Sequence, residues 1–362
     1  MEWKKINEIF PINNVGIVTA RDKFAIDLDL TTLKNRIRQF RDLKVDNILI
    51  KEPFRLKDTS TFKLDKFRKE LAKDDNWWDH FKLITYRPFD VRHIYYSKWV
   101  IERPIYNTMR HMLEENIGLV ASRINRQVSL GYFFLTDLLT DFHVLDNARD
   151  STSLFPLYVY PDKNKKDLFN QHQTGKQSNI SGAIFEKLKS IYGQKQMPEE
   201  ILYYIYGVFY SNIYRETYAE FLKIDFPRMP FTADYELFKK ISALGKELAD
   251  LHLLKSPALD LPVAKYQGTS ENDRITKIVY KEDQQRIYIN KDKYFEGIEP
   301  EVWNYHIGGY QVLQKYLKDR KGRNMDDAPR YCRIVTSLSK TIEIQKEIDE
   351  IYHEVEKKLV KF

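Results

Sequence analysis

The chain has 362 residues, of which 43% are hydrophobic, 31% charged and 14% aromatic. Its 13 glycines and 13 prolines are too few for a collagen-like or low-complexity chain, and the hydrophobic share excludes wholesale disorder. Lysine and arginine (59) exceed aspartate and glutamate (52), which gives a mild net charge of +7. The distribution of that charge is therefore more informative than its size.

A single cysteine, Cys332, excludes an internal disulfide framework and is typical of a reducing compartment. The chain contains no apolar run of about 18 residues, and its first residues lack the apolar centre of a signal peptide. We therefore expect a folded cytoplasmic protein that does not enter a membrane.

Residues 1–83 are expected to form an N-terminal connector with helical segments. An extended stretch at 15–19 comes first, a helix is expected at 64–71, and the apolar run 48–50 favours a strand. Another helix is expected after Asp29, with Thr31 or Thr32 as its cap and with an apolar face of Leu33, Ile37, Phe40 and Leu43.

Residues 84–162 are β-rich, with short apolar runs separated by turns and one helix near 105–113. The expected strands lie at 94–96, 118–121, 131–135 and 154–160. The polar segment 162–182 has no apolar period and is typical of a surface loop or linker.

Residues 183–362 are mostly helical, with a hairpin at 275–289. The final helix alternates lysine and glutamate outside one apolar stripe, a pattern typical of a long exposed helix packed along one seam. The expected helices cover 184–192, 199–210, 214–222, 234–254, 310–317 and 331–358. The fold class is therefore α+β, a mixed sheet domain with short strands followed by a helical region.

Catalytic and cofactor motifs are missing from the sequence. There is no G-x-G spacing, no Walker A loop, no G-x-S-x-G elbow and no helical H-E-x-x-H pair. The Pro-Pro dipeptide of the loop with which amino-methylating enzymes grip a flipped base is also absent. We therefore expect no catalytic residue, metal or cofactor in this chain, although the sequence leaves open whether it is part of an enzyme.

The first basic cluster spans residues 86–126, where seven cations face four acids and aromatic residues are interleaved. Guanidinium groups bind phosphates and guanine edges, so this composition favours nucleic-acid contact. The alternative is that Arg87 and Arg92 form structural ion pairs with Asp90 and Glu102. The candidate contact residues here are Arg87, Arg92, Arg103, Arg110 and Arg123.

A short polar loop follows the strand expected at 118–121. Arginine, asparagine and glutamine are the side chains best suited to bidentate base contacts, and this loop contains all three. A plain polar turn explains the composition equally well. The candidate base-reading residues are Arg123, Asn125, Arg126 and Gln127.

The second basic cluster spans residues 315–333, where seven cations face three acids at the end of a helix and in the following loop. This position suits a phosphate-contacting patch, and cations that stabilise the helix dipole are the alternative. The candidates are Lys318, Arg320, Lys321 and Arg323.

Asp137, Asp141 and His143 are the basis of a different hypothesis, a stand-alone enzyme that acts on nucleic acid through a metal or an acid–base pair. Nothing supplies a third ligand at standard spacing, so helix capping and core hydrogen bonding explain these residues better. A third hypothesis is a scaffold module with incidental basic patches. The tyrosines at 203–210 and Cys332 are expected in the core.

Seven stretches, in this order, resemble the C-terminal specificity region of Type ISP restriction-modification enzymes and related adenine-methylating restriction proteins. They are FPINNVGIVTARDKFAID (10–27), YRPFDVRHIYY (86–96), ERPIYNTMRHML (102–113), LGYFFLTDLLTDFHVLD (130–146), LFPLYVYPD (154–162), YIYGVFYSNIYRETYAEFLKIDFPRMP (204–230) and RIYINKDKYFEGIEPEVWNYHIGGYQVLQKYLKDRKGR (286–323).

The resemblance implies a target recognition domain that reads a short duplex-DNA sequence beside an N6-adenine methyltransferase domain or subunit. S-adenosylmethionine would then bind to that other part. The chain departs from the whole enzymes in lacking their methyltransferase and helicase motifs, so their catalytic residues cannot be carried over. We expect 84–162 and 183–362 to form two parts of this recognition domain, and the long final helix to dock to the methyltransferase or its partner chain.

Overall fold

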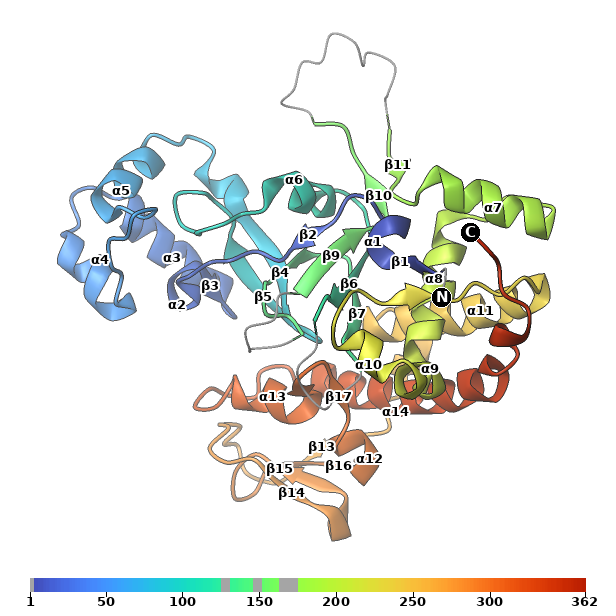
Figure 1. Cartoon of the computed structure of the whole chain (residues 1–362). Helices are drawn as coiled ribbons and strands as arrows, with labels where there is room; N and C mark the ends of the chain where they lie inside the picture. Colours follow the sequence, from blue (N-terminus) through green and yellow to red (C-terminus); the bar gives the residue numbers. More distant parts are fainter. Residues whose placement is uncertain (1–2, 125–130, 146–151, 163–174) are drawn as a thin grey trace.

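The computed structural model describes residues 3–124, 131–145, 152–162 and 175–362. Figure 1 shows three groups of elements around a central pair of sheets. Helices from residues 22–72 lie on one side, helices from residues 182–252 lie on the other, and a small sheet from residues 265–296 lies below the long C-terminal helix. The class is α+β, which confirms the prediction.

Two four-stranded sheets form the centre. The first is antiparallel with the order β2-β9-β6-β7, and the second has the order β3-β5-β4-β8, in which β4 and β8 run parallel. The strands of the first sheet are β2 (Asn14–Val15), β6 (Gly118–Ser122), β7 (Phe133–Thr136) and β9 (Thr152–Pro156). Those of the second are β3 (Ile26–Asp27), β4 (Phe81–Arg87), β5 (Asp90–Tyr95) and β8 (Leu139–Thr140).

The first sheet separates two hydrophobic cores. On β6, Val120 belongs to the core shared with the N-terminal helices, whereas Leu119 and Ala121 belong to the core of the helical body. Successive side chains of a strand point to opposite faces, and β7 and β9 repeat the alternation. The sheet therefore joins the two halves of the molecule.

The N-terminal helices confirm two predictions and correct two details. The helices expected after Asp29 and at 64–71 are present, but the cap of the first is Asp29, whose side chain accepts a hydrogen bond from the backbone of Thr32 at 2.6 Å. Leu43 lies beyond the end of that helix and is 54% exposed, so it is not on the buried face. The helices are α2 (Asp22–Ala25), α3 (Leu30–Arg41), α4 (Asn47–Phe54) and α5 (Leu64–Ala72).

The prediction of a strand at 48–50 is wrong, because these residues belong to α4. The side chain of Asp46 accepts a hydrogen bond from the backbone of Ile48 at 2.7 Å and begins the helix. Of the three apolar side chains, only Ile50 is buried. A short apolar run is compatible with a strand or a helix. Here the capping side chain of Asp46 favours the helix.

The helical body packs around two close helices, α8 and α11. Gly207 and Gly245 lie at their crossing, where a Cβ on Gly245 would overlap the carbonyl of Tyr203. The tyrosines of α8 lie mostly in the core, as predicted. The helices in this part are α7 (Gly182–Tyr192), α8 (Pro198–Tyr210), α9 (Asn212–Thr217), α10 (Ala219–Leu222) and α11 (Tyr235–His252). The short helix α6 (Tyr106–Met109) lies outside it, and its Met109 belongs to the core shared with the N-terminal helices.

The long helix α14 (Ala328–Tyr352) spans both cores. It contacts α8, α9, α11 and β13 (Lys265–Gln267), so this chain covers more of it than a single seam would. The predicted long helix is present, but it is less exposed than predicted, because neighbours from both halves of the molecule pack on it. Cys332 is buried, and burial raises the pKa of its thiol to about 11.

The hairpin expected at 275–289 is confirmed and belongs to a four-stranded sheet. No helix in the described part of the chain has the length and apolar character needed to cross a bilayer. The remaining elements are α1 (Ile6–Ile9), α12 (Pro300–Trp303), α13 (Val312–Lys318), β1 (Lys4–Lys5), β10 (Tyr158–Val159), β11 (Gln177–Ser178), β12 (Arg228–Met229), β14 (Val279–Lys281), β15 (Arg286–Tyr288), β16 (Tyr294–Glu296), β17 (His306–Ile307) and β18 (Tyr310–Gln311).

Candidate nucleic-acid interface

The two basic clusters of the sequence meet in the structure. Arg92 of β5 lies 2.8 Å from Asp319, and Arg320 lies 2.7 Å from Asp90. The first pair joins residues 227 positions apart and the second joins residues 230 positions apart. One ion-pair network between β5 and the end of α13 therefore joins the two basic clusters, which are far apart in the sequence.

Asp90 is the centre of this network. It is 2% exposed and accepts hydrogen bonds from Arg92 at 2.6 and 3.0 Å and from Arg320 at 2.7 Å. Burial opposes ionisation of this carboxyl, but Arg320 and Arg92 outweigh it and hold the pKa of Asp90 below its ordinary value. The predicted pairing of Arg92 with Asp90 is confirmed, and Arg92 serves the fold.

The turn between β4 and β5 places Asp90. In the antiparallel register of β4 and β5, the backbone of Arg87 lies opposite that of Asp90, and Pro88 and Phe89 form the turn between them. Phe89 has a φ of 63°. A type II turn requires a positive φ at its third residue and often has proline at its second, as here. The Phe89 ring packs edge-on against Phe134 at 5.3 Å, so the core holds the turn in place.

Arg87 is also an internal residue. It is 7% exposed, it lies 2.7 Å from Asp141, and its guanidinium stacks 3.9 Å from the centre of the Tyr86 ring. Asp141 has one arginine partner, whereas Asp90 has two. Because one arginine does not outweigh burial, the pKa of Asp141 is raised above its ordinary value. The partner of Arg87 is therefore Asp141, and Glu102 pairs with Arg21 instead.

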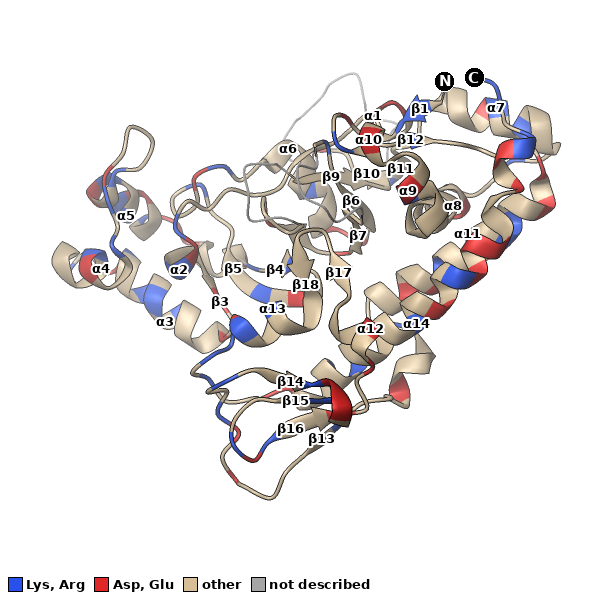
Figure 2. Ribbon diagram, turned by 60° about the horizontal axis from the view of Figure 1, so that its bottom comes forward, with Lys and Arg blue, Asp and Glu red and all other residues tan. Residues whose placement is uncertain are grey.

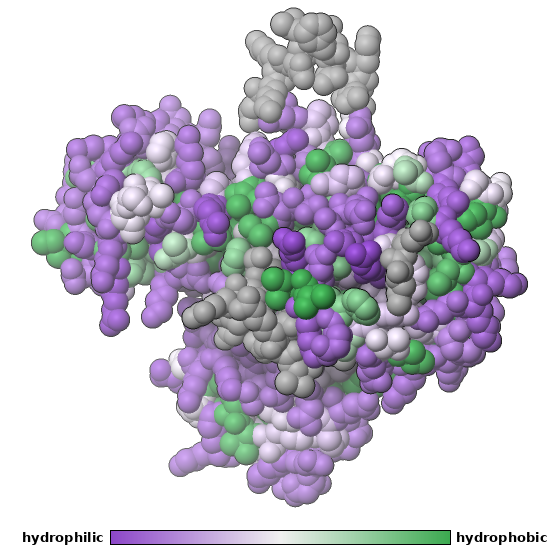
Figure 3. Space-filling view, viewed as in Figure 1, coloured by the Kyte–Doolittle hydropathy of each residue, from purple (hydrophilic) through white to green (hydrophobic). Residues whose placement is uncertain are grey.

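Three cations at the end of α13 remain at the surface. Lys318, Lys321 and Arg323 are exposed, and the side chain of Arg323 is 50% exposed at 3.4 Å from Asp27. Arg323 lines a cavity of about 470 Å³ between the N-terminal helices and α13. Figure 2 shows basic segments of α3 and of the end of α13 near each other, and Figure 3 shows that the surface over the N-terminal helices is mostly hydrophilic.

The other candidates lie apart from this network. Arg110 donates a hydrogen bond to the carbonyl of Tyr160 at 2.7 Å, and Arg103 is exposed. The side chain of Arg123 is 64% exposed and lies 3.4 Å from Asp225. The three remaining base-reading candidates, Asn125, Arg126 and Gln127, lie outside the described residues.

The carboxylates of the enzymatic hypothesis have separate partners. Asp137 lies 2.6 Å from Lys255, whereas Asp141 is bound to Arg87 and accepts a hydrogen bond from the backbone of His143 at 2.9 Å. Within the described ranges, no group of three or more histidine, cysteine, aspartate or glutamate residues is arranged to hold a metal. The geometry gives no support to catalysis by these residues.

Two tyrosines support the network, Tyr86 from the first basic cluster and Tyr316, which the sequence analysis did not name. Arg320 lies 3.5 Å from the ring centre of Tyr316, and Arg92 lies 3.8 Å from that of Tyr86. Tyr316 lies in the last turn of α13 and Arg320 lies just beyond its end, and the spacing of four residues, a signal that was available in the sequence, keeps the two side chains close. The aromatic rings in these clusters therefore hold the arginines in place.

These features define a mixed α+β domain in which exposed cations flank a buried network of arginine and aspartate. The chain belongs to the family of the Type ISP C-terminal specificity domain, whose model matches residues 8–350. A search of curated proteins found no match.

Solved structures share this fold. The ATP-dependent Type ISP restriction-modification enzyme LlaBIII, bound to DNA, superposes with a TM-score of 0.72 at 21% identity over 94% of this chain and 24% of that enzyme. A nuclease-deletion mutant of the Type ISP enzyme LlaGI with a DNA substrate mimic gives 0.65 at 19% identity, over 94% of this chain and 28% of that one. A DrdV–DNA complex gives 0.69 at 19% identity, over 96% and 36%. The chain thus spans about a quarter to a third of these proteins.

Proposed function

We propose that the chain binds duplex DNA as the target recognition domain of a restriction-modification enzyme and catalyses no reaction by itself. Membership of the specificity-domain family is the observation that carries this proposal. It is supported by the DNA present in the complexes of LlaBIII, LlaGI and DrdV. The exposed cations at the end of α13 supply suitable chemistry.

The candidate residues divide into two roles under this proposal. Lys318, Lys321 and Arg323 contact backbone phosphates, which sets affinity and its dependence on salt. The network of Arg87, Arg92 and Arg320 holds that surface in place. Base reading is proposed for Arg123, Asn125, Arg126 and Gln127, and further phosphate contacts for Arg103 and Arg110.

The partner of the chain in this proposal is a methyltransferase domain or subunit in the cytoplasm. S-adenosylmethionine would bind to that partner. The missing glycine loop in this sequence and the small share of the related enzymes that the chain spans support the division.

Charge removal tests the proposal. In the triple variant Lys318→Ala, Lys321→Ala, Arg323→Ala, the slope of log affinity against log salt concentration should fall by about 2.7, because each lost phosphate contact removes about 0.9. The matched control removes three exposed lysines from α11 (Lys239→Ala, Lys240→Ala, Lys246→Ala) and should keep the wild-type slope. Equal slopes for the two triple variants would contradict the assigned surface, and no duplex binding by the wild type at about 50 mM salt would favour a scaffold module.

A further inference from the structure

A second arginine site lies on the helical body, away from the Asp90 network. Arg215 of α9 is 7% exposed, and its Nε donates a hydrogen bond to the carbonyl of Phe209 at 2.5 Å. Its guanidinium lies 4.5 Å from the centre of the Tyr210 ring. Across the ranges that the structure describes, no carboxylate forms an ion pair with it.

Arg68 shows how this chain otherwise satisfies a buried arginine that has no carboxylate partner. It is 3% exposed, and its guanidinium donates to four oxygens. These are the carbonyls of Phe40, Asp42 and Val45 and the side chain of Asn47. A buried cation requires such partners, since desolvation is costly. Arg215 contacts only neutral acceptors among the described residues, namely the Phe209 carbonyl and the Tyr210 and Tyr305 hydroxyls. Its charge is therefore not balanced and can attract an anionic ligand.

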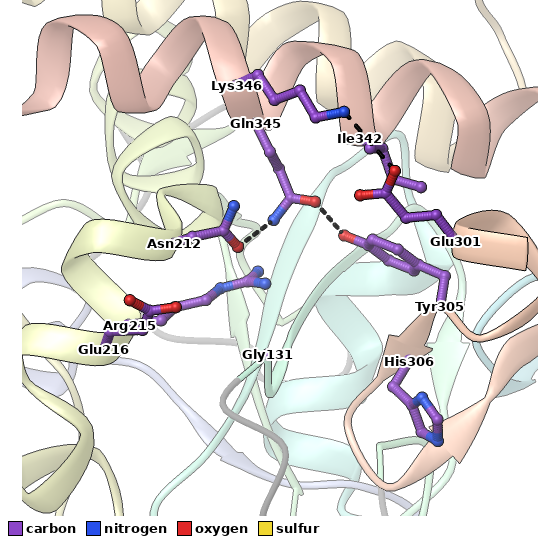
Figure 4. Close-up of a pocket in the computed structure, with 10 residues that line it drawn as sticks. All are labelled: Gly131, Asn212, Arg215, Glu216, Glu301, Tyr305, His306, Ile342, Gln345 and Lys346. Carbon is purple, nitrogen blue, oxygen red and sulfur yellow. Dashed lines mark hydrogen bonds and ion pairs between the residues drawn. The ribbon is translucent and has the colours of Figure 1, made fainter.

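Arg215 lines a pocket of about 360 Å³. Figure 4 shows the guanidinium end of Arg215 directed into the space between Gly131 and Tyr305. A Cβ on Gly131 would lie 2.9 Å from Nη1 of Arg215, so glycine makes room for the guanidinium. Polar side chains of α9, of the segment before β17 and of α14 line the rest of the pocket, among them Asn212, Tyr305 and Gln345.

Gln345 organises the polar wall of the pocket. It is 4% exposed, accepts a hydrogen bond from the Tyr305 hydroxyl at 2.7 Å, and donates to Asn212 at 3.1 Å and to the carbonyl of Tyr210 at 3.0 Å. These bonds position a hydroxyl and an amide beside the guanidinium before any ligand arrives, which reduces the cost of ordering on binding.

The acids of the pocket lie at its exposed rim. Glu216 and Glu301 are exposed, and Glu301 lies 3.6 Å from Lys346. Solvent and salt screen exposed charges, whereas the charge of the buried Arg215 is screened much less. The interior of the pocket is therefore electropositive despite two carboxylates at its edge.

We propose that this pocket binds a phosphate group, and that in a DNA complex the group is a phosphodiester of the duplex backbone. The planar guanidinium matches two phosphate oxygens, and one phosphodiester charge balances one arginine. Gly131 directly follows the segment of the proposed base-reading residues, and β17 leads through β18 and α13 to the exposed cations. The DNA source of the phosphate rests on the proposed function, and the pocket itself does not.

The test compares Arg215→Gln, Arg215→Lys and the control Arg68→Gln for duplex binding over a range of salt concentrations. Arg215→Gln should lower the salt slope by about 0.9, whereas Arg215→Lys keeps the charge and the slope. Arg68→Gln should keep the slope even where it lowers the thermal midpoint. A wild-type slope in folded Arg215→Gln overturns the contact with the duplex backbone. If Arg215→Gln does not fold, Gly131→Ala replaces it: it crowds the guanidinium, and unchanged duplex affinity would overturn the same contact.

Titration with inorganic phosphate, followed by calorimetry without DNA, separates the sources of the group. Heat that Arg215→Gln abolishes supports the pocket as a phosphate site, and if the wild type binds no duplex, the source is free phosphate and the proposed function fails alone. If neither the heat of phosphate binding nor the salt slope depends on Arg215, the inference is overturned.

Discussion

Arg320 and Lys321 are neighbours in the chain and have opposite environments. Arg320 lies over the Tyr316 ring and binds the buried Asp90, whereas Lys321 is exposed to solvent. The same contrast separates the buried Arg87 and the half-buried Arg92 from the exposed Lys318 and Arg323. A basic motif in this domain therefore contains both residues that build the surface and residues that are free to contact a ligand.

The largest effect is expected from removing the acid at the centre of the buried network. Asp90→Ala leaves Arg92 and Arg320 without their shared partner, and should lower the free energy of unfolding by about 3–5 kcal/mol. Urea denaturation measures this change. The exposed Asp326→Ala should change stability by no more than about 0.5 kcal/mol, and equal effects of the two variants would contradict the difference between buried and exposed charges.

The neighbours Arg320 and Lys321 test the same contrast between a supporting and a contacting cation. Arg320→Ala should destabilise the fold by about 2 kcal/mol, because it removes one of the two arginines that hydrogen-bond to the buried Asp90 carboxylate. Lys321→Ala should leave stability within about 0.5 kcal/mol and lower the salt slope of duplex binding by about 0.9. Denaturation and binding measured on both variants check this, and a loss of stability in Lys321→Ala would show that the lysine also belongs to the network.

Acid should affect Asp90 and Asp141 in opposite directions. The folded-state pKa of Asp90 is lowered, so its stabilisation is complete above the unfolded pKa of about 3.9 and is lost as the pH falls through the folded value. The pKa of Asp141 is raised, so its contribution to stability increases as the pH falls through its folded value. The differences in unfolding free energy between wild type and Asp90→Asn, and between wild type and Asp141→Asn, should therefore change with opposite signs as the pH falls through the two folded-state pKa values. Changes of the same sign would refute the assignment.

The smallest change in stability is expected at Arg323. Its side chain is half exposed and lies 3.4 Å from Asp27, so Arg323→Ala should cost less than about 0.5 kcal/mol. The same variant should lower the salt slope by about 0.9. A larger loss of stability with an unchanged slope would move Arg323 from the contacting group to the supporting one.

Local patterns predicted most helices of this chain. The apolar period of α3, α5, α8 and α11 marks their buried faces, and the hairpin at 275–289 follows its turn residues. The run 48–50 failed because three apolar residues fit either period, and Asp46 decided for a helix.

The candidate site was less predictable, because its defining contacts are not local. Sequence spacing suggests that Arg92 can pair with Asp90, but nothing near either residue indicates Arg320 or Asp319. Burial separates supporting from contacting arginines, and burial depends on the packing of α13 against the N-terminal half. Arg215 carries no flanking basic residues, so only its pocket in the folded chain draws attention to it.

The distance along the chain between Asp90 and Arg320 affects how this protein is made. At a synthesis rate of about 5–20 residues per second, the 230 residues between them emerge from the ribosome over roughly 10–50 s. During that time the turn at Phe89 and the strand β5 have no partner for the second half of their charge network. The nascent N-terminal half is then a candidate for chaperone binding and proteolysis, and release of α13 from the ribosome is the event that completes it.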